Sequence, residues 1–420
     1  MSDLLVIGAG LAGMMAGIAA AQKGLRARIV ATGLGATHWH AGTIDVLGYL
    51  PGEDAPVKSP FAALPALIAA RPGHPYALLG EDGLRRALDE FRALTEALGL
   101  PYRGAAQADA NLLLPSPAGA PRPAFLAPDA QLAGDMSRPE PYLIVGFQAL
   151  RDFYPTVIAE NLTKLGLQAR AEFLPIELVT TRRDFSTVHL AQALDEEGAA
   201  ERLAAGLRKI VRPGERIGLP AILGLREHAR VMAALRQALD APIFEIPTLP
   251  PSAPGVRLAN ALRDHFERDL RGRLDLGMTV TDFEAREGRI AWVSSRASAR
   301  PVKHRAQRFL LATGGLLGGG FAGEVTGRVR EVVFDLPLDA PQKRSQWFRP
   351  DFLAAEGHPV FRGGLRIGPD FRPLGADGGP AYENLWAAGN LFADCDPIAE
   401  RSMEGVAIAT ALASIAFLPS

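Results

Sequence analysis

The sequence predicts an α/β fold organised around a parallel sheet of the Rossmann kind, on three observations. Leu4-Leu5-Val6-Ile7 is a short apolar run, typical of a strand buried on both faces, and the glycines of a G-x-G-x-x-G motif follow it at once. A helix of small residues then leads to a second apolar strand at residues 27–30. Far along the chain, another apolar strand ends in Thr313-Gly314. A Rossmann βαβ unit that distant segments complete is therefore expected.

The composition is that of an ordinary globular enzyme and excludes several functions. The chain has 420 residues, of which 48% are hydrophobic and 22% are charged, which is enough for two or three folded units. The 45 Lys and Arg residues balance 46 Asp and Glu residues, so no basic field exists to gather nucleic acid or an anionic membrane. Cys395 is the only cysteine, which excludes an internal disulfide and a thiolate cluster for zinc or iron–sulfur centres. No metal site is expected.

Two apolar stretches, residues 4–21 and 406–418, resemble membrane spans but are not expected to be spans. The first is punctuated by glycines at functional spacing and lacks the basic leader of a signal peptide, and the second is too short. A cytoplasmic protein is predicted.

Gly8, Gly10 and Gly13 are the glycines of the opening motif, and each has an expected task. The first permits a tight turn, the second lets a pyrophosphate approach the backbone, and the third allows close packing. The helix N-terminus offers unpaired N–H groups and the positive end of its dipole to the phosphates. A dinucleotide or flavin site is predicted here.

The end of the second strand departs from the usual pattern. An Asp or Glu commonly binds the ribose hydroxyls about 20 residues beyond the glycines, but this chain has Ala31 followed by Thr32. Thr32 can still make one hydrogen bond, so it is a candidate contact. The missing carboxylate weakens the case for an adenosine half, and FMN is therefore favoured over FAD.

The loop at residues 35–43 offers small residues, hydroxyls and N–H groups at the place where the chain of such proteins passes a flavin. Thr37, Gly42 and Thr43 are its candidate cofactor contacts. His38 and His40 are candidate proton donors, and the alternative for both is a packing or hydrogen-bonding role within the loop.

Segments near the C-terminus favour a flavin over a nicotinamide cofactor. An A-T-G element ends one strand, a later strand ends at a glycine that conventionally lies beside the ribityl chain, and the last helix would favour reduced, anionic flavin at its N-terminus. A domain that binds only a nicotinamide cofactor does not require this C-terminal helix. The predicted fold is thus a glutathione-reductase-like (FAD/NAD(P)-binding Rossmann) flavin domain. The candidate contacts are Thr313, Gly314, Gly389, Asp396, Gly405 and Val406.

The middle of the chain has an αβ pattern of its own and is read as an insert. The expected elements are a helix at 83–98, a strand at 142–145, a helix from about 150 to 165, a strand at 217–222, a helix starting near 255 and a hairpin turning at 287–288. The discontinuous flavin domain is expected to comprise residues 1–50, 247–330 and 373–420, with an αβ insert or cap at 51–246 and a small cap at 331–372.

Several of these motifs, together with other segments of the chain, resemble those of a known family, the B subunit of the anaerobic glycerol-3-phosphate dehydrogenase. The similarity runs over nearly the whole chain. The His-Pro-Tyr segment and the proline-rich turn are not general flavoprotein features, whereas residues 400–405 are less glycine-rich than in the family. The matching segments are the opening glycines, the loop around His38, Gly73-His74-Pro75-Tyr76, Leu249-Pro250-Pro251-Ser252, and Glu383-Asn384-Leu385 through Asp396-Pro397-Ile398-Ala399.

The resemblance implies a flavoprotein subunit with two partners, a catalytic flavoprotein subunit and an iron–sulfur membrane-anchor subunit. The complex would oxidise sn-glycerol 3-phosphate to dihydroxyacetone phosphate and pass electrons toward quinone. The resemblance also implies FMN and a place at the inner face of the membrane through a partner only.

Two other functions stay open. A stand-alone flavin dehydrogenase or reductase of the fumarate-reductase-like kind would need converging substrate-binding residues, for which Arg257, Arg330 and His74 are scattered candidates. A subunit that keeps the fold, holds no cofactor and only docks its partner is the second. His38 and His74 are weak catalytic candidates, and no converging acid–base pair is visible in the sequence.

Overall fold

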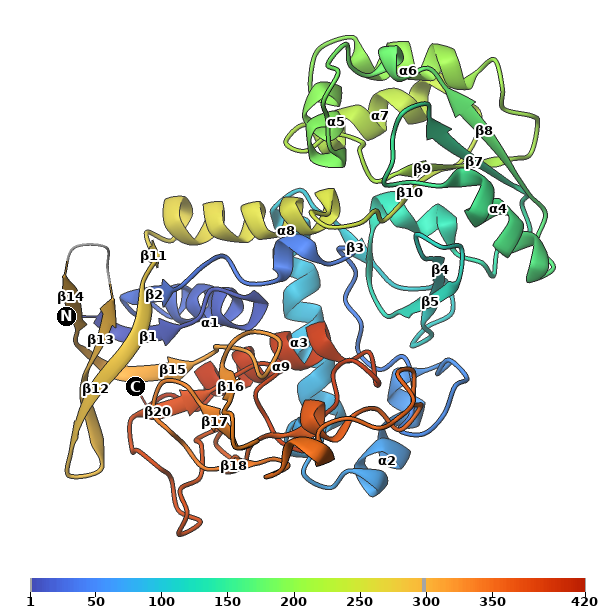
Figure 1. Ribbon diagram of the computed structural model, residues 1–420. Coiled ribbons are helices and arrows are strands. Elements are labelled where there is room, and N and C mark those ends of the chain that lie inside the picture. The colour runs from blue at the N-terminus through green and yellow to red at the C-terminus, as the bar shows by residue number, and fades with distance from the viewer. Residues whose placement is uncertain (1, 297–299, 420) are drawn as a thin grey trace. The chain divides into compact units, whose positions relative to one another are not determined.

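The computed structural model describes residues 2–296 and 300–419, and the chain divides into two compact units. Unit 1 comprises residues 1–36, 45–91 and 261–420, and unit 2 comprises residues 37–44 and 92–260. Unit 1 therefore includes residues 51–91 from the expected insert. Figure 1 shows the elements of both units along the chain.

The core of unit 1 is a five-stranded parallel sheet in the order β11-β2-β1-β15-β20. Its strands come from segments far apart in the sequence. The central strands are apolar because both of their faces are buried. The predicted α/β Rossmann fold is confirmed. The strands are β1 (Ser2–Ile7), β2 (Ala27–Ala31), β11 (Arg273–Leu276), β15 (Ala306–Leu311) and β20 (Leu385–Ala387).

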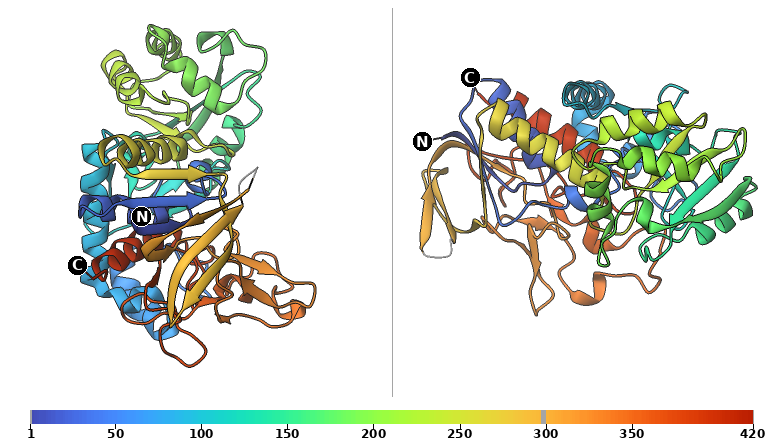
Figure 2. Two further views of the ribbon diagram at one scale, coloured as in Figure 1. Left: turned by 90° about the vertical axis from the view of Figure 1, so that its left-hand side faces the viewer. Right: turned by 90° about the horizontal axis from the view of Figure 1, so that it is seen from above.

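Two helices and a second sheet cover the two faces of this parallel sheet. Helices α1 (Leu11–Gln22) and α9 (Met403–Ala416) pack side by side, as the right-hand view of Figure 2 shows in blue and red. A three-stranded antiparallel sheet of β12 (Thr279–Arg286), β13 (Arg289–Arg296) and β14 (Pro301–His304) shares a core with residues of β1 and β15. The hairpin between β12 and β13 turns at residues 287–288, as predicted.

Unit 1 also contains the first helices after the opening βαβ unit and four short strands. Helix α3 (Pro75–Ala97) continues into unit 2, and its backbone is non-helical at Gly80. The expected helix at 83–98 corresponds to the part beyond this kink, with Leu84, Leu88 and Phe91 buried. The other elements are α2 (Pro60–Ala70), β16 (Phe321–Gly323), β17 (Val329–Glu331), β18 (Leu338–Asp339) and β19 (Gly364–Leu365).

Unit 2 is built on a four-stranded parallel sheet in the order β10-β9-β7-β8, drawn mainly in green in Figure 1. Its strands are β7 (Tyr142–Phe147), β8 (Ala169–Leu174), β9 (Arg216–Pro220) and β10 (Ile243–Ile246). Its helices are α4 (Pro155–Lys164), α5 (Thr187–Leu194), α6 (Ala199–Leu207), α7 (His228–Ala238) and the first part of α8 (Ala253–Asp264). Two short ladders join β3 (Tyr102–Arg103) to β6 (Ala127–Pro128) and β4 (Leu112–Pro115) to β5 (Pro121–Ala124).

Helix α4 begins five residues later than expected. The predicted start near residue 150 is wrong because Pro155 occupies the first turn of the helix. Proline disfavours helical backbone at the preceding residue but is well suited to the first helical position.

Among the described residues, no helix has both the length and the apolar character needed to cross a membrane.

Candidate cofactor site

The three motif glycines lie where β1 meets α1, and each has a different neighbourhood. A Cβ on Gly8, whose φ is 116°, would lie 2.2 Å from the carbonyl oxygen of Ala312. A Cβ on Gly13 would lie 1.9 Å from the carbonyl oxygen of Gly8. A Cβ on Gly10, by contrast, would meet no atom within 4 Å. The backbone is therefore closely packed at Gly8 and Gly13 and open at Gly10, where a phosphate could approach.

Helix α1 starts at this opening without a side-chain cap. Gly10 is its N-cap residue, and the first turn contains no acidic residue. The first N–H groups of a helix have no partner within the helix, and its dipole is positive at this end. The start of α1 therefore suits the negative charge of a pyrophosphate.

Two buried polar atoms without partners follow the ends of β15 and β20. The hydroxyl of Thr313 and the side-chain oxygen of Asn390 make no hydrogen bond within the described part of the chain. The N–H of Gly315 donates to the carbonyl oxygen of Asn390 at 2.7 Å, which joins the two loops. Because an unsatisfied buried polar atom costs about 1–3 kcal/mol, these atoms fit a ligand with hydroxyl or amide groups.

The end of β20 is held against helices α1 and α9. The N–H of Gly389 donates to the hydroxyl of Thr410 in α9 at 2.9 Å. A Cβ on Gly389 would lie 2.9 Å from the Cβ of Ala12 in α1. The predicted contacts Gly389, Thr313 and Gly314 thus follow the carboxyl ends of the two strands beside the opening of α1.

The start of α9 is fixed by contacts within the protein. The N–H of Gly405 donates to the carbonyl oxygen of Asp45 at 3.0 Å, and the N–H of Val406 donates to that of Ser402 at 2.9 Å. A Cβ on Gly405 would lie 2.4 Å from the hydroxyl of Tyr76. Close packing therefore requires the glycine, and contacts of Gly405 and Val406 with a cofactor stay a prediction.

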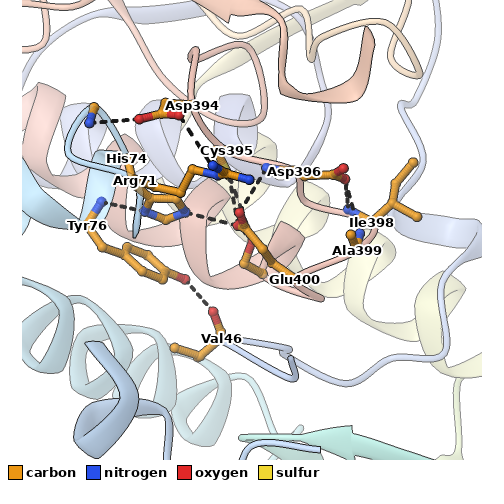
Figure 3. Close-up of polar contacts among 12 residues, drawn as sticks. Val46, Arg71, His74, Tyr76, Asp394, Cys395, Asp396, Ile398, Ala399 and Glu400 are labelled. Atoms are coloured by element: carbon orange, nitrogen blue, oxygen red, sulfur yellow. Dashed lines mark hydrogen bonds and ion pairs between the residues drawn. The ribbon is translucent and has the colours of Figure 1, made fainter. Parts of the chain in front are cut away.

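Asp396 lies in the turn that precedes α9. One carboxyl oxygen accepts hydrogen bonds from the N–H groups of Ile398 and Ala399 at 3.2 and 3.1 Å (Figure 3). The other oxygen is buried with no partner among the described residues. Burial raises the pKa of Asp396 above its usual value. These contacts give Asp396 a role in the turn, and its predicted cofactor contact stays a prediction.

His74 is fully buried and has a partner at each ring nitrogen. Its Nδ1 accepts a hydrogen bond from the N–H of Tyr76 at 3.1 Å, and its Nε2 lies 3.1 Å from a carboxyl oxygen of Glu400 (Figure 3). The Nδ1 contact places the ring proton on Nε2, so Nε2 donates to Glu400. This arrangement favours a structural role for His74 over a catalytic one.

His74, Cys395 and Glu400 bring three possible metal-ligand atoms within 4.8 Å of one another. A ligating histidine would need a free lone pair on Nε2 and a proton on Nδ1. At Nδ1 that proton would oppose the N–H of Tyr76. The geometry therefore favours a hydrogen-bonded cluster over a metal centre. Burial and the charge of Glu400 raise the pKa of the Cys395 thiol, so this cysteine is not a reactive thiolate.

Unit 2 contains residues 37–44, among which are the predicted contacts Thr37, Gly42 and Thr43. Thr37 is buried, and the hydroxyl of Thr43 accepts a hydrogen bond from Arg122 at 2.6 Å. The ring of His38 packs edge-on against that of Trp39, with centroids 5.2 Å apart. A Cβ on Gly42, whose φ is 84°, would lie 2.5 Å from Pro254.

His40 and Gln131 place buried polar atoms at this loop. The Nδ1 of His40 accepts a hydrogen bond from the N–H of Gly42 at 2.7 Å. Burial, with the charges of Arg122 and His38, lowers the pKa of His40 to about 4, so its ring is neutral at pH 7 and carries its proton on Nε2. That Nε2 and the side-chain oxygen of Gln131 have no partner among the described residues.

The candidates for a self-sufficient substrate site have partners in their own units. Arg257 donates to both carboxyl oxygens of Glu245 at 2.6 and 2.8 Å, and both side chains are buried. Arg330 pairs with Glu324 at 3.8 Å. With His74 bound to Glu400, each of the three already has an internal role.

Asn390, Gln131 and Glu400 were not among the residues predicted from the sequence. Asn390 directly follows the predicted Gly389, so its position next to that glycine was an available signal. Glu400 meets His74 across 326 residues of chain. No local pattern marks such a pair.

The comparisons with known proteins agree with this geometry. Residues 3–405 match the FAD binding domain family. The chain is 34% identical to the probable B subunit of the anaerobic glycerol-3-phosphate dehydrogenase of Halobacterium salinarum, over 98% of this chain and 96% of that protein. It is 32% identical to the B subunit of the anaerobic glycerol-3-phosphate dehydrogenase of Yersinia pestis, over the same shares.

Two solved structures of low sequence identity also align with nearly the whole chain. The 3-ketosteroid Δ1-dehydrogenase of Sterolibacterium denitrificans is 13% identical, with a TM-score of 0.44, over 99% of this chain and 98% of that one. A flavocytochrome c3 fumarate reductase is 10% identical, with a TM-score of 0.42, over 99% and 77% of the two chains.

The family match corrects the expected cofactor, because it indicates FAD and the preference for FMN is wrong. β2 ends at Ala31 with Thr32 after it, so no carboxylate stands there for the ribose, and the Thr32 hydroxyl lies 3.0 Å from that of Thr279. One missing hydrogen bond changes binding by only about 0.5–1.5 kcal/mol, which is too little to exclude an adenosine half. The open Gly10, the uncapped α1 and the orphaned atoms of Thr313 and Asn390 fit a flavin dinucleotide. The chain belongs to the B-subunit family of the anaerobic glycerol-3-phosphate dehydrogenases.

Proposed function

We propose that this protein is the FAD-binding electron-transfer subunit of a complex that oxidises sn-glycerol 3-phosphate to dihydroxyacetone phosphate. Full-length similarity to the B subunits of anaerobic glycerol-3-phosphate dehydrogenases is the observation that carries the proposal. Bound FAD supplies two-electron acceptance and one-electron release. The chain contributes a pyrophosphate cradle at Gly8, Gly10 and Gly13 and a neutral His40 in unit 2.

The proposal includes a catalytic flavoprotein subunit and an iron–sulfur membrane-anchor subunit as partners. A single cysteine cannot hold an iron–sulfur cluster, so electrons must leave this chain through another protein or a diffusible acceptor. The proposed location is the cytoplasmic face of the inner membrane, reached through the anchor. Mild detergent or salt should release the chain, and resistance to both would contradict this location.

The internal partners of Arg257, Arg330 and His74 support partner-dependent activity over a stand-alone dehydrogenase. The test is steady-state oxidation of sn-glycerol 3-phosphate with an artificial electron acceptor, for the FAD-loaded chain alone and with the catalytic subunit. The chain alone should be slow, and the partner should restore turnover. Turnover by the isolated chain at an enzyme-like rate, roughly 1–1,000 per second, would reverse this assignment.

His38 is the first residue to change in the reconstituted complex, because sequence reasoning places its loop beside the flavin. His38→Ala should leave the rate within about twofold if the ring only packs on Trp39. A fall of about 100-fold or more, the usual size of acid–base catalysis, would instead assign it a proton-transfer role. Trp39→Ala, which removes the packing partner alone, is the matched control.

A further inference from the structure

Glu400 is a buried carboxyl group surrounded by hydrogen-bond donors. It is 1% exposed. One oxygen accepts from His74 Nε2 at 3.1 Å, the Ser402 hydroxyl at 3.2 Å and the Cys395 thiol at 3.6 Å. The other accepts from the N–H of Asp396 at 3.2 Å. The four contacts are the kind that a carboxylate accepts, and the His74 ring, whose Nδ1 is itself an acceptor, donates to Glu400 through Nε2.

This carboxylate stands shortly before the N-terminus of α9. Ser402 is the N-cap residue of α9, yet its side chain makes no capping hydrogen bond and donates to Glu400 instead. Arg401, between them, has a φ of 47°, a left-handed conformation that a non-glycine residue seldom adopts. The contacts of Glu400 therefore fix both the turn and the direction of the Ser402 hydroxyl.

The start of α9 is in turn tied to the candidate cofactor site. The side-chain N–H of Asn390 donates to the carbonyl oxygen of Met403 at 3.2 Å. The carbonyl oxygen of Asn390 accepts from Gly315, in the loop that follows β15. The N-terminus of α9, and the negative charge before it, thus lie at the carboxyl edge of the parallel sheet, where α1 also begins.

We propose that Glu400 is a positioning residue that sets the start of α9 and lowers the reduction potential of the FAD bound there. The N-terminus of a helix carries roughly half a positive charge, which stabilises a reduced, anionic flavin. A fixed carboxylate two residues before the N-cap opposes that potential. The inference rests on the FAD site argued above and not on the identity of the substrate.

The test is the midpoint potential of bound FAD in Glu400→Gln, measured by anaerobic titration without substrate. The variant keeps the shape of the side chain and removes its charge, so the potential should rise. A tenfold gain in the ratio of reduced to oxidised FAD corresponds to about 30 mV for a two-electron couple. Glu383→Gln is the matched control, because Glu383 is an exposed partner of Arg289 and should leave the potential unchanged.

Ser402→Ala supplies the second arm and keeps the proposal testable if Glu400→Gln does not fold. It removes one donor from Glu400 and leaves the charge less compensated, so the potential should fall. Opposite shifts in the two variants support the electrostatic role, because loss of structure alone would not produce them. An unchanged potential in FAD-loaded Glu400→Gln, or shifts of the same sign in both variants, would overturn the proposal. Because no substrate is used, a wrong substrate assignment would not affect the result.

Discussion

Gly10 and Gly13 belong to one motif, but substitutions at these two glycines should affect different properties. A change at Gly10 should affect cofactor binding, and a change at Gly13 should affect the stability of the fold. A side chain on Gly10 would enter open space, whereas one on Gly13 would meet the backbone at Gly8. Gly10→Val should therefore leave the thermal unfolding of the apoprotein nearly unchanged and weaken FAD binding at least about tenfold, which is about 1.4 kcal/mol. FAD titration and thermal unfolding of the apoprotein measure the two effects.

Gly13→Val is the matched variant, and its effect should fall on the fold. The backbone must shift to admit the side chain, so we expect a loss of about 2–4 kcal/mol in stability. Full FAD occupancy in Gly10→Val, or an apoprotein as stable with Gly13→Val as without it, would remove the basis for this site.

Residue spacing predicts the glycines of the site but not its buried partners. Gly8, Gly10 and Gly13 stand at fixed offsets after a strand. These offsets place one glycine at the tight turn, one at the phosphate and one at the close packing of the helix. The contact between His74 and Glu400 is set by packing of residues 326 positions apart. The preference for FMN is wrong for a related reason: the missing acid at Ala31 removes one hydrogen bond, and the other contacts that a dinucleotide makes are not visible in the local sequence.

At the scale of elements, apolar runs predict the central strands well and the edges poorly. β7 and the later parts of β1, β2 and β15 are buried on both faces and are continuous apolar segments in the sequence. The sequence does not predict β11, because Arg273–Leu276 is a short edge strand in which charged and apolar residues alternate and both end residues are exposed. Its pairing partner β2 is more than 240 residues earlier in the chain, and that pairing leaves no local signal.

The Glu245–Arg257 pair joins β10 to α8 within unit 2 and should matter strongly for stability. Both side chains are buried, and Arg257 also donates to the carbonyl oxygen of Gly224. Arg257→Ala leaves a buried carboxylate without its cation, which costs about 3–5 kcal/mol. Urea unfolding monitors this loss. The control is Arg236→Ala, which breaks a solvent-exposed pair with Asp129 and should cost less than about 1 kcal/mol; equal losses in the two variants would contradict the account.

His228 lies at the start of α7, and its lowered pKa in the folded state predicts how stability depends on pH. Burial, followed by the charge of Arg257, lowers its pKa to about 4, from an ordinary value of 6.5. The unfolded chain therefore binds more protons than the folded chain between these values, so stability should fall as the pH drops from about 6.5 to about 4. His40 acts in the same direction.

The measurement is the urea midpoint between about pH 7.5 and about pH 4.5, for the wild type and for His228→Gln, a range that spans most of this window. The variant removes one titrating group, so its stability should depend less steeply on pH. An identical slope in the two proteins would mean that the pKa of His228 is not depressed in the folded state.

At the scale of the whole molecule, the sheet of unit 1 needs segments from both ends of the chain. β1 pairs with β15, and β15 with β20, so the candidate FAD site forms only when distant segments have folded together. Protein denatured after purification should release FAD, as chromatography of the extract would show. Release of FMN instead would contradict the cofactor that the family match indicates.

Anaerobic reduction of the bound FAD by sn-glycerol 3-phosphate tests the central claim most directly. The absorbance of the FAD reports its redox state within a single turnover, with the chain alone and after addition of the catalytic subunit. The account predicts that FAD in the isolated chain stays oxidised, or is reduced only slowly, and that the partner makes its reduction fast. Rapid reduction in the isolated chain would contradict the role as a partner-dependent electron-transfer subunit, and so would FAD that stays oxidised in the complete complex.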